Sequence, residues 1–514
     1  MYFISTRGNE KVTGAQAIVQ GLAKDGGLFV PETFPSVSAE ELETMMEMNY
    51  AERAAFILGK YLGEELGEEF LKESCAKAYA TFSGSDPAPL VKIDGNLYVL
   101  ELFHGPTCAF KDMALTVLPY LLKKSCEVTG NDDEILILAA TSGDTGKAAL
   151  EGFRDVKGTK VAVFYPEEGV AKMQRMQMRI QDGNNVFVSA VKGNFDDCQR
   201  AVKRLFASEE FNAKLAEKKI KLSSANSINF GRLAPQIAYY FSSYLDLLTS
   251  DQIEMGEKVD FVVPTGNFGD ILAGWYAKQM GLPVRKLVCA SNRNKVLADF
   301  FAKGTYDVKR NFFRTMSPSM DILVSSNLER LLFEISGRNA ALTAERMQKL
   351  ATEKEYSITA KEKAILDEQF FAGFSKEDDT VEAMYEIFDE YGYAMDTHTG
   401  VALAVCAQYR NTLETEDEKK KDKTPIIVLS TANPYKFPQD VLYALSGNDV
   451  KDSFKGIKRL NLLTAMKPPR CLLDLRYRPE RFKGTVENDL DKMAELILHF
   501  ADGNIIPVPD APKK

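Results

Sequence analysis

From about residue 91 onward, short apolar runs alternate with stretches of helical character, and this alternation limits the possible fold more than any other feature. Several runs are nearly continuous in Val, Ile and Leu, as expected for strands that are buried on both faces. The runs are LYVLEL (97–102), EILILAA (134–140), KVAVFY (160–165), NVFVSAV (185–191), VDFVVP (259–264), KLVCA (286–290) and PIIVLS (425–430). Buried strands that alternate with helices predict an α/β protein with mostly parallel sheets flanked by helices.

The first 90 residues differ from this pattern and predict a mainly helical N-terminal region. Apolar residues recur at near-helical spacing over 39–63, and Ser38 is a suitable cap for the start of that helix. The segment DGGLFVPETFP (25–35) is rich in Gly and Pro, which predicts a loop with turns. Late in the chain, the charge run TLETEDEKKKDKT (412–424) predicts a solvated loop before the last buried strand.

The composition restricts the partners and the compartment of the protein. The chain carries 64 Lys and Arg against 73 Asp and Glu, and this acidic balance argues against a general nucleic-acid-binding protein. It contains neither the roughly 18-residue apolar run of a membrane span nor the N-terminal apolar stretch of a signal peptide. The seven cysteines form no C-x-x-C pair and predict reduced thiols in a cytoplasmic protein. The three histidines are too scattered to predict a zinc site.

Three segments share one layout, in which an apolar strand is followed by a polar or Gly-rich turn and then a helix. They are ILILAATSGDTGKAAL, VDFVVPTGNFGDILAGW and IIVLSTANPYKF. Ligands bind at the carboxyl ends of strands in open α/β sheets, and free N–H groups at a helix start attract anions. The turn GNFGD (266–270) lacks the lysine of a nucleotide-binding P-loop, so a single phosphate held by backbone amides fits it better. Each turn alone fits a purely structural role better, but the occurrence of three such turns favours a ligand site.

The segment LFHGPTCAFKDMAL (102–115) contains a lysine, Lys111, between an apolar residue and a predicted helix. A free lysine amine is a poor nucleophile at neutral pH, whereas a partly desolvated lysine beside a cofactor can form a Schiff base. The pattern by itself fits an ordinary surface lysine better than a Schiff-base lysine.

Taken together, these segments resemble the signatures of threonine synthases, a family of pyridoxal-phosphate enzymes. HGPT-x-AFKD is similar to the family's cofactor-lysine motif, and TSGDTG, GNFGD and STANPYKF resemble its other signatures in the same order. Further similar segments are STRGNEKV…GLAKDGGLFVP, SSANSINFGRLAPQ and SPSMDILVSSNLERLLFE, so the resemblance runs from residue 2 to about residue 440. It implies pyridoxal-phosphate-dependent fold type II, that of the tryptophan-synthase β-subunit, and the SPSMDI segment is similar to the longer microbial and fungal branch.

The resemblance also implies a reaction and a cofactor. The family converts O-phospho-L-homoserine and water to L-threonine and phosphate, which is the last step of threonine biosynthesis. Lys111 would be the catalytic residue and would carry pyridoxal 5'-phosphate as a Schiff base. The other cofactor-binding residues would be Gly266, Asn267, Phe268 and Gly269 around the cofactor phosphate and Thr431 at the pyridine nitrogen.

For the substrate, the resemblance and the residue chemistry imply two groups of contacts. They are Thr141, Ser142 and Thr145 near the substrate carboxylate, and Asn226, Ser227, Asn229 and Arg232 around the substrate phosphate. Lys436 is a weaker candidate for the substrate phosphate. The segment SANSINFGR fits a capped helix start equally well.

Two positions depart from the pattern of related proteins. Many relatives of this fold have TSGNTG, where the Asn contacts the ring oxygen of the cofactor, but here the position is Asp144. A carboxylate would repel a phenolate, so we expect Asp144 to point elsewhere and assign it no role. Many family members have His before the proline of the late motif, where this chain has Asn433, and no titrating histidine can act there.

The resemblance predicts how the chain divides. Residues 1–90 would form the N-terminal domain, and 134–240 a smaller α/β domain carrying the substrate loop. Residues 91–133 and 241–514 would form the large cofactor-binding domain, with a largely helical insertion at about 304–395. A monomer and a homodimer are both compatible with the family.

Two other functions stay open. One is another lyase of this fold, such as a threonine dehydratase or a phospho-lyase. The other is a protein that binds the cofactor without turnover.

Overall fold

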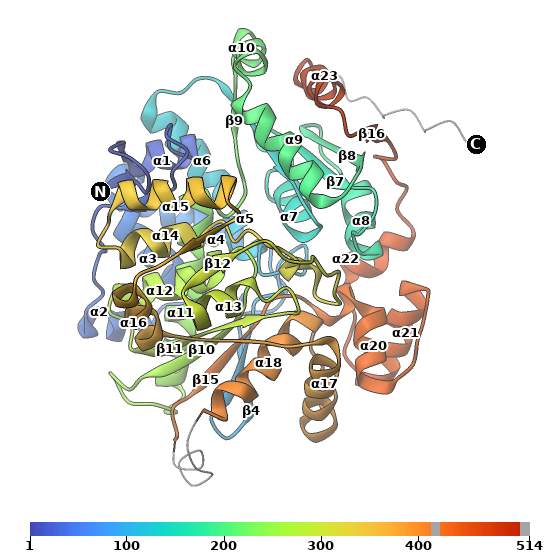
Figure 1. Cartoon of the computed structure of the whole chain (residues 1–514). Coiled ribbons are helices and arrows are strands. Elements are labelled where there is room, and N and C mark those ends of the chain that lie inside the picture. Colours follow the sequence, from blue (N-terminus) through green and yellow to red (C-terminus); the bar gives the residue numbers. More distant parts are fainter. Residues whose placement is uncertain (413–421, 504–514) are drawn as a thin grey trace.

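Two open sheets form the framework of the protein in the computed structural model, which describes residues 1–412 and 422–503 (Figure 1). The larger sheet has six strands and the smaller has five, and helices cover both of them. Most of the charge run that predicts a solvated loop over 412–424 lies outside the described residues.

The strands and helices have the following bounds. The strands are β1 (Tyr2–Ser5), β2 (Lys11–Thr13), β3 (Phe29–Pro31), β4 (Leu90–Asp94), β5 (Leu97–Glu101), β6 (Glu134–Ala140), β7 (Thr159–Pro166), β8 (Val186–Lys192), β9 (Ile220–Ser223), β10 (Val259–Pro264), β11 (Val284–Ser291), β12 (Thr305–Asp307), β13 (Glu355–Ser357), β14 (Phe370–Phe374), β15 (Ile426–Ser430) and β16 (Thr485–Glu487). The helices of the first half are α1 (Gly14–Gln20), α2 (Ala39–Met46), α3 (Tyr50–Leu66), α4 (Glu68–Tyr79), α5 (Asp112–Leu115), α6 (Leu118–Thr129), α7 (Asp144–Gly152), α8 (Lys172–Arg179), α9 (Phe195–Ala207), α10 (Glu209–Glu217) and α11 (Phe230–Thr249). Those of the second half are α12 (Gly269–Gln279), α13 (Val296–Lys303), η1 (Pro318–Met320), α14 (Leu328–Ile335), α15 (Ala340–Thr352), α16 (Ala360–Gln369), α17 (Glu377–Tyr391), α18 (Thr397–Arg410), η2 (Pro434–Lys436), α20 (Pro438–Ser446), α21 (Ser453–Thr464), α22 (Arg470–Leu473), η3 (Asp474–Arg476) and α23 (Leu490–Ala501).

The larger sheet has the strand order β14-β11-β10-β15-β5-β4. All of its neighbouring strands are parallel except β4, which pairs antiparallel with β5. Strands β10 and β15 are buried along their whole length, and α18 packs against both of them. The nearly continuous apolar sequence of these strands follows from this burial, because neither face of the sheet meets water.

The smaller sheet is parallel throughout, with the order β16-β8-β7-β6-β9, and α7 and α9 pack on it. All seven strands predicted from the apolar runs are present in the two sheets, and β6 and β10 have the predicted bounds. The predicted fold class, an α/β protein with mostly parallel sheets flanked by helices, is confirmed. In both sheets the carboxyl ends of parallel strands lead into the turns that the sequence predicts to bind ligands.

The N-terminal region contains a sheet that the sequence did not predict. Strands β1, β2 and β3 form a small antiparallel sheet that contacts α1, and β3 lies within the segment expected to be a loop. The expected helix over 39–63 is two helices, because Asn49 makes a capping box with Glu52 and starts α3 anew. Ser38 caps the first of them, as predicted.

Two late segments return to sheets formed by earlier parts of the chain. Residues 304–395 contain α14 to α17, yet they also contain β14, which is the edge strand of the larger sheet. Strand β16 pairs with β8, so the C-terminal segment ends on the smaller sheet. The pairing of β16 with β8 was not predicted from the sequence.

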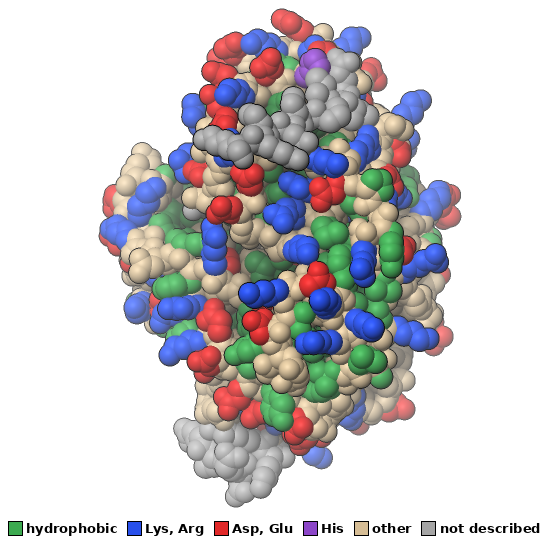
Figure 2. Space-filling model, turned by 90° about the vertical axis from the view of Figure 1, so that its right-hand side faces the viewer, with side chains coloured by type: hydrophobic (Ala, Val, Ile, Leu, Met, Phe, Trp, Pro, Cys, Tyr) green, Lys and Arg blue, Asp and Glu red, His purple; other side chains and the backbone are tan. Residues whose placement is uncertain are grey.

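Acidic and basic side chains are interspersed over the face shown in Figure 2, as the nearly balanced charge count suggests. Apolar side chains are exposed among the C-terminal helices, with Leu462 at 76% and Tyr477 at 80% exposure. Within the described residues, no helix is both long and apolar enough to cross a membrane.

Candidate functional site

The loop that carries Lys111 lies directly against the late STANPYKF segment. The backbone N–H of Phe110 donates to the carbonyl of Thr431 over 2.8 Å, and that of Asn433 donates to the carbonyl of Cys108 over 3.1 Å. Strands β5 and β15 are neighbours in the larger sheet, so the two loops that follow them leave from the same edge. This pairing brings together two of the segments that the sequence predicts to bind the cofactor.

The Lys111 amine lies in a buried setting. The residue is 8% exposed, and its Nζ lies 4.3 Å from the ring centroid of Phe110 and 3.9 Å from Oδ2 of Asp144. Burial lowers the pKa of Lys111 to about 8, although the Asp144 carboxylate partly opposes this effect. The neutral amine, which is the form that attacks a carbonyl, is therefore far more abundant near neutral pH than for an ordinary lysine.

Asp144, to which the sequence assigns no role, faces Lys111 and Lys436. Its Oδ1 lies 2.6 Å from Nζ of Lys436 and accepts a 2.8 Å hydrogen bond from Nε2 of Gln174. Oγ of Ser319 donates to Oδ2 over 3.3 Å. Burial favours the neutral acid, but Lys436 and Lys111 outweigh it and hold the pKa of Asp144 below its ordinary value. The carboxylate is therefore ionised between two lysines, and Asp144 and Lys436 belong to the centre of the site.

The GNFGD turn joins β10 to the start of α12 and has little room for side chains. A Cβ on Gly266 would lie 2.8 Å from the carbonyl oxygen of Ser319, and one on Gly269 would lie 3.2 Å from Cβ of Ser227. Phe268 adopts a left-handed backbone conformation with φ of 64°, and its side chain is buried. The first amides of α12 have no partner within the helix, so this tight turn presents N–H groups suited to an anion.

Hydrogen bonds from the segment before α14 hold this turn in place. Ser325 donates through Oγ to the carbonyl of Gly266 over 2.7 Å, and the backbone N–H of Asn327 donates to the carbonyl of Asn267 over 3.1 Å. Nδ2 of Asn327 also donates to Oγ of Ser227 over 2.8 Å. The predicted substrate residue Ser227 thus lies beside the predicted phosphate turn.

Two polar residues at the start of α11 have different partners. Asn229 caps the helix, and Arg232 has no ion-pair partner among the described residues. Asn229 donates through Nδ2 to the carbonyl of Ile18 over 3.0 Å and accepts from the N–H of Gly231 over 2.9 Å, so its side chain caps the helix. Arg232 is 3% exposed and donates to the carbonyl of Ala225 over 2.8 Å. Burial lowers its pKa to about 10, and it forms no ion pair with any described residue. A buried guanidinium without a carboxylate is suited to bind an anionic ligand.

The TSGDTG turn uses its first threonine for its own structure. Oγ1 of Thr141 accepts hydrogen bonds from the N–H groups of Gly143 at 3.0 Å and of Gly146 at 2.9 Å. Gly143 has φ of 148°, and a Cβ there would lie 2.4 Å from Oε1 of Gln174. Ser142 and Thr145 are half-buried, and neither side chain has a hydrogen bond within the described residues. Their hydroxyls are the ones available to a ligand.

The remaining predicted residues have clear places. Thr431 is 6% exposed in the segment paired with the Lys111 loop. Asn433 accepts from the N–H of Tyr435 over 3.0 Å and caps η2, so it has a structural role that needs no histidine. Asn226 is half-buried at the turn before α11, where its carbonyl accepts from the N–H of Asn229.

Three buried polar side chains near the site were not singled out from the sequence. Gln174 and Gln177 lie on α8, and each has an Oε1 without a partner in the described structure. Asp270 accepts from the hydroxyl of Tyr239 over 2.5 Å, its Oδ2 has no partner there, and burial raises its pKa to about 6. Gln174 and Gln177 are three positions apart and so lie on one face of α8, and this spacing is the signal by which the sequence could have indicated them.

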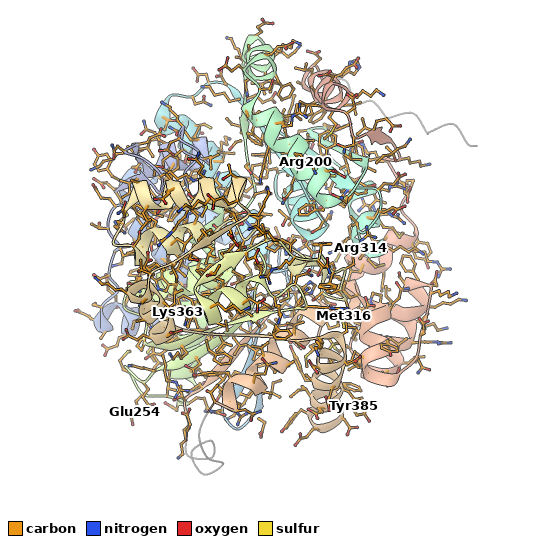
Figure 3. All side chains as sticks on the ribbon, viewed as in Figure 1. Arg200, Glu254, Arg314, Met316, Lys363 and Tyr385 are labelled. Carbon is orange, nitrogen blue, oxygen red and sulfur yellow. The ribbon has the colours of Figure 1, made fainter. Side chains whose placement is uncertain are left out.

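A long segment before η1 connects the two sheets at the site. Thr397 of α18 donates to the carbonyl of Met316 over 2.6 Å, while Arg314 lies against Gly169 of the smaller α/β part, 3.6 Å from an added Cβ there (Figure 3). Ser319, which reaches Asp144, follows in η1. The site is therefore assembled from both parts of the molecule.

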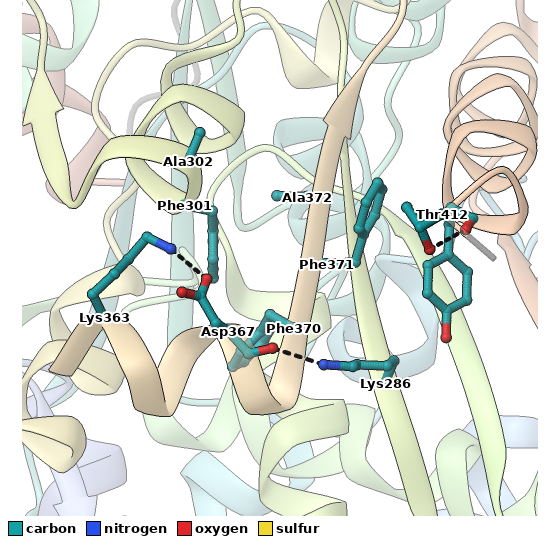
Figure 4. Close-up of a pocket in the computed structure, with 10 residues that line it drawn as sticks. Lys286, Phe301, Ala302, Lys363, Asp367, Phe370, Phe371, Ala372 and Thr412 are labelled. Atoms are coloured by element: carbon teal, nitrogen blue, oxygen red, sulfur yellow. Dashed lines mark hydrogen bonds and ion pairs between the residues drawn. The ribbon is translucent and has the colours of Figure 1, made fainter. Parts of the chain in front are cut away.

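A separate hollow of about 340 Å³ lies at the edge strand β14 (Figure 4). Its wall includes Phe301, Phe370 and two lysines. Lys363 pairs with Asp367, and Lys286 donates to backbone carbonyls of α16. None of the predicted site residues lines it, so it is not the candidate site.

Comparisons with known proteins cover nearly the whole chain. Residues 2–79 match the family model "Threonine synthase N terminus", 83–360 match "Pyridoxal-phosphate dependent enzyme", and 399–497 match "Threonine synthase, C-terminal". The threonine synthase of Saccharomyces cerevisiae is 35% identical over 521 residues, with 95% of this chain and 98% of that protein covered.

Two further similarities complete this comparison. Human threonine synthase-like 1 is 39% identical over 88% of this chain, but the matched part spans only 62% of that longer protein. The crystal structure of a PLP-bound threonine synthase from Brucella melitensis aligns with a TM-score of 0.85 at 36% identity, covering 98% of this chain and 99% of that one.

Proposed function

The chain belongs to the threonine synthase family, and we propose on this basis that it converts O-phospho-L-homoserine and water to L-threonine and phosphate. The observation that supports the proposal is that the buried Lys111 amine lies within electrostatic range of Arg232, which has no ion-pair partner among the described residues, and of Asp270, which ends the tight GNFGD turn. A cofactor with an aldehyde and a phosphate needs the amine and the turn, and a phosphorylated substrate needs the guanidinium.

The site fits pyridoxal 5'-phosphate, the cofactor of this enzyme family. The turn has little room for a side chain at Gly266 or Gly269, so its backbone can approach a ligand closely, and the N–H groups that start α12 suit a phosphate. Lys111 supplies the amine, and Thr431 supplies a neutral hydroxyl for the ring nitrogen. When bound, the cofactor acts as the electron sink of the reaction.

We assign the proton transfers to Lys111. Its low pKa allows the amine to take up and release a proton near neutral pH, which suits a group that moves protons at Cα and Cβ of the substrate. The carboxylate of Asp144, 3.9 Å away, stabilises the ammonium form, and Lys436 keeps that carboxylate ionised. Asp144 and Lys436 are thus positioning residues that adjust the proton affinity of Lys111.

We assign the substrate phosphate to the start of α11 and the substrate carboxylate to the TSGDTG turn. Arg232 and Ser227 are the donors that favour the phosphate position, with Asn226 beside them. Ser142 and Thr145 have free hydroxyls for the carboxylate, whereas Thr141 and Asn229 shape their turns.

We also propose that the protein acts in the cytoplasm on this small molecule, as a monomer or homodimer and without nucleic acid. The smaller α/β part would carry the substrate loop, and the larger part would hold the cofactor.

The test is incubation of the purified protein with O-phospho-L-homoserine, followed by assays of threonine and phosphate. Equal amounts of both products are expected. Release of 2-oxobutyrate and ammonia would instead identify a dehydratase-like lyase. An absorbance band of the bound cofactor without any product would identify a protein that binds but does not turn over.

A further inference from the structure

Two cysteines that the proposed chemistry does not use lie with their sulfur atoms together beside the Lys111 loop. Sγ of Cys108 is 3.3 Å from Sγ of Cys471, although 363 positions separate them in the sequence. Cys108 is 3% exposed and lies three residues before Lys111, in the loop that pairs with the STANPYKF segment. Cys471 lies in α22 and is exposed to solvent as a residue.

The loop around Cys108 is fixed from several sides. The carbonyl of Thr107 accepts from Nζ of Lys436 over 2.9 Å, and the N–H of Thr107 donates to Asp112 over 2.8 Å. Cys108 itself adopts a left-handed backbone conformation with φ of 61°. Its sulfur is therefore held in place facing α22, and the two thiols can react without unfolding of this loop.

We propose that Cys108 and Cys471 form a peroxide-responsive disulfide, in which Cys471 reacts first and Cys108 closes the bond. The Cys471 thiolate attacks one oxygen of hydrogen peroxide, the O–O bond breaks, and a sulfenic acid forms while hydroxide leaves and is protonated to water. The sulfur of Cys108 then attacks the sulfur of the sulfenic acid. The S–O bond breaks, the Cys108 proton leaves with the hydroxyl as water, and two electrons have passed from the thiols to the peroxide.

The surroundings of the two thiols agree with this order. The hydrogen bond from Cys108 lowers the pKa of Cys471, and the cations of Lys436 and Lys147 add to this effect against burial. The same contact and burial raise the pKa of Cys108. Cys471 is the more exposed residue and has the more acidic thiol, so it meets the oxidant first, and the buried Cys108 resolves the product.

The other cysteines lack this combination. Burial raises the pKa of Cys75, Cys198, Cys289 and Cys406 to about 12, and each is buried. Cys126 is half-buried, and burial raises its pKa as well. Peroxide should therefore act first at Cys471.

The bond would join two segments that contact different parts of the site. The C-terminal segment after α22 is attached to α8, because the N–H groups of Arg481 and Phe482 donate to the carbonyl of Arg179 over 2.8 and 2.9 Å. Helix α8 also carries Gln174, which holds Asp144. A disulfide at Cys108 would thus tie the Lys111 loop to the segment that packs on α8.

The experiment treats the whole protein with hydrogen peroxide, blocks the remaining thiols, and maps the peptides by mass spectrometry without reduction. A Cys108–Cys471 peptide is expected, with two fewer titratable thiols than the seven cysteines of the untreated chain, and dithiothreitol should reverse both changes. Cys471→Ser should abolish the linked peptide, whereas the matched control Cys126→Ser should retain it. This readout does not depend on the proposed reaction.

Oxidation of Cys471 to sulfinic acid without a linked peptide, or links that favour other cysteines, would overturn the proposal. The fold of the Cys108→Ser variant is checked by circular dichroism. In the folded variant, peroxide should oxidise Cys471 to a sulfenic acid that has no resolving thiol and that dimedone labels. Absence of that label in folded Cys108→Ser would equally contradict the assigned order.

Discussion

Nζ of Lys436 lies 2.6 Å from Oδ1 of Asp144, and both side chains are almost completely buried. Lys436 belongs to the STANPYKF segment of the larger sheet, and Asp144 begins the helix after β6 of the smaller sheet. The ion pair therefore joins the two parts of the molecule at the site. The other carboxylate oxygen of Asp144 lies 3.9 Å from Nζ of Lys111. The ion pair between Lys436 and Asp144 therefore lies directly beside the amine that we propose to act in catalysis.

Removal of the Lys436 charge should be costly for the fold. Lys436→Met would leave the Asp144 carboxylate buried without its nearest cation, and loss of one partner of a buried pair costs about 3–5 kcal/mol. The measurement is the free energy of unfolding in urea. Asp144→Asn in the same chain should restore part of the loss, because the uncompensated charge is then gone. The control Lys214→Met removes an exposed lysine of α10 and should change little. Equal midpoints for Lys436→Met and the parent protein would rule out this role.

The Lys111 amine should titrate at a much lower pH than the amine of an ordinary lysine. Its pKa is lowered from 10.5 to about 8 by burial. Only the neutral amine attacks the cofactor aldehyde, so the rate of covalent attachment to cofactor-free protein should rise as the pH increases through about 8. Because the Asp144 carboxylate raises this pKa, Asp144→Asn should move the midpoint to lower pH. Stopped-flow absorbance at a series of pH values measures both midpoints. A shift to higher pH in Asp144→Asn would show that the carboxylate does not stabilise the ammonium form.

Replacement of Lys111 by alanine should separate binding from turnover. The GNFGD turn and Thr431 do not depend on this side chain, so Lys111→Ala should still bind pyridoxal phosphate in equilibrium dialysis. Phosphate release from O-phospho-L-homoserine should fall by at least about 10²–10⁴-fold, the usual contribution of one acid–base group. Borohydride treatment of the parent protein should fix the cofactor on Lys111 and on no other lysine. Release of phosphate at the parent rate by the variant would mean that another base moves the protons.

The sequence alone was sufficient to predict the strands that are buried on both faces. The runs that became β6 and β10 are nearly continuous in apolar residues, and this pattern is typical of parallel strands covered by helices on both sides. Strands β1 to β3 were missed because segments of three or four residues are too short to give a periodic signal. The break between α2 and α3 was missed because apolar spacing continues through it, although Asn49 and Glu52 form a recognisable capping box.

The site was less predictable where a role depends on distant partners. The turns could be found locally, because glycines and strand ends are close in sequence. The direction of the Asp144 side chain could not be predicted locally, because its partner Lys436 belongs to a segment that is remote in the chain. The sequence also could not predict that Arg232 lacks an ion-pair partner, because the fold is needed to show that no carboxylate of the described residues pairs with it.

The two glycines of the phosphate turn should be needed for cofactor affinity. A side chain at Gly266 would meet the carbonyl of Ser319 at 2.8 Å, which would push the turn away from its position. Gly266→Val should therefore weaken pyridoxal phosphate binding in a fluorescence titration, and Gly269→Val should do so to a smaller extent. Gly59→Ala is the control, because a Cβ there meets nothing within 4 Å and its helix should become slightly more stable. A folded Gly266→Val with unchanged affinity would place the cofactor phosphate elsewhere.

Arg232 should contribute to the affinity for the phosphorylated substrate. A charge-assisted hydrogen bond contributes about 1.5–3 kcal/mol, so Arg232→Met should raise the KM for O-phospho-L-homoserine by roughly 10- to 150-fold. The cofactor absorbance should persist, because Arg232 is not part of the GNFGD turn. Inorganic phosphate should inhibit the parent protein by competition and lose this effect in the variant. Arg200→Met is the matched control, since Arg200 is an exposed arginine on α9 with 66% side-chain exposure (Figure 3). If Arg232→Met retained both the KM and the phosphate inhibition, the substrate phosphate would have to bind another cation, and Lys436 would be the next candidate.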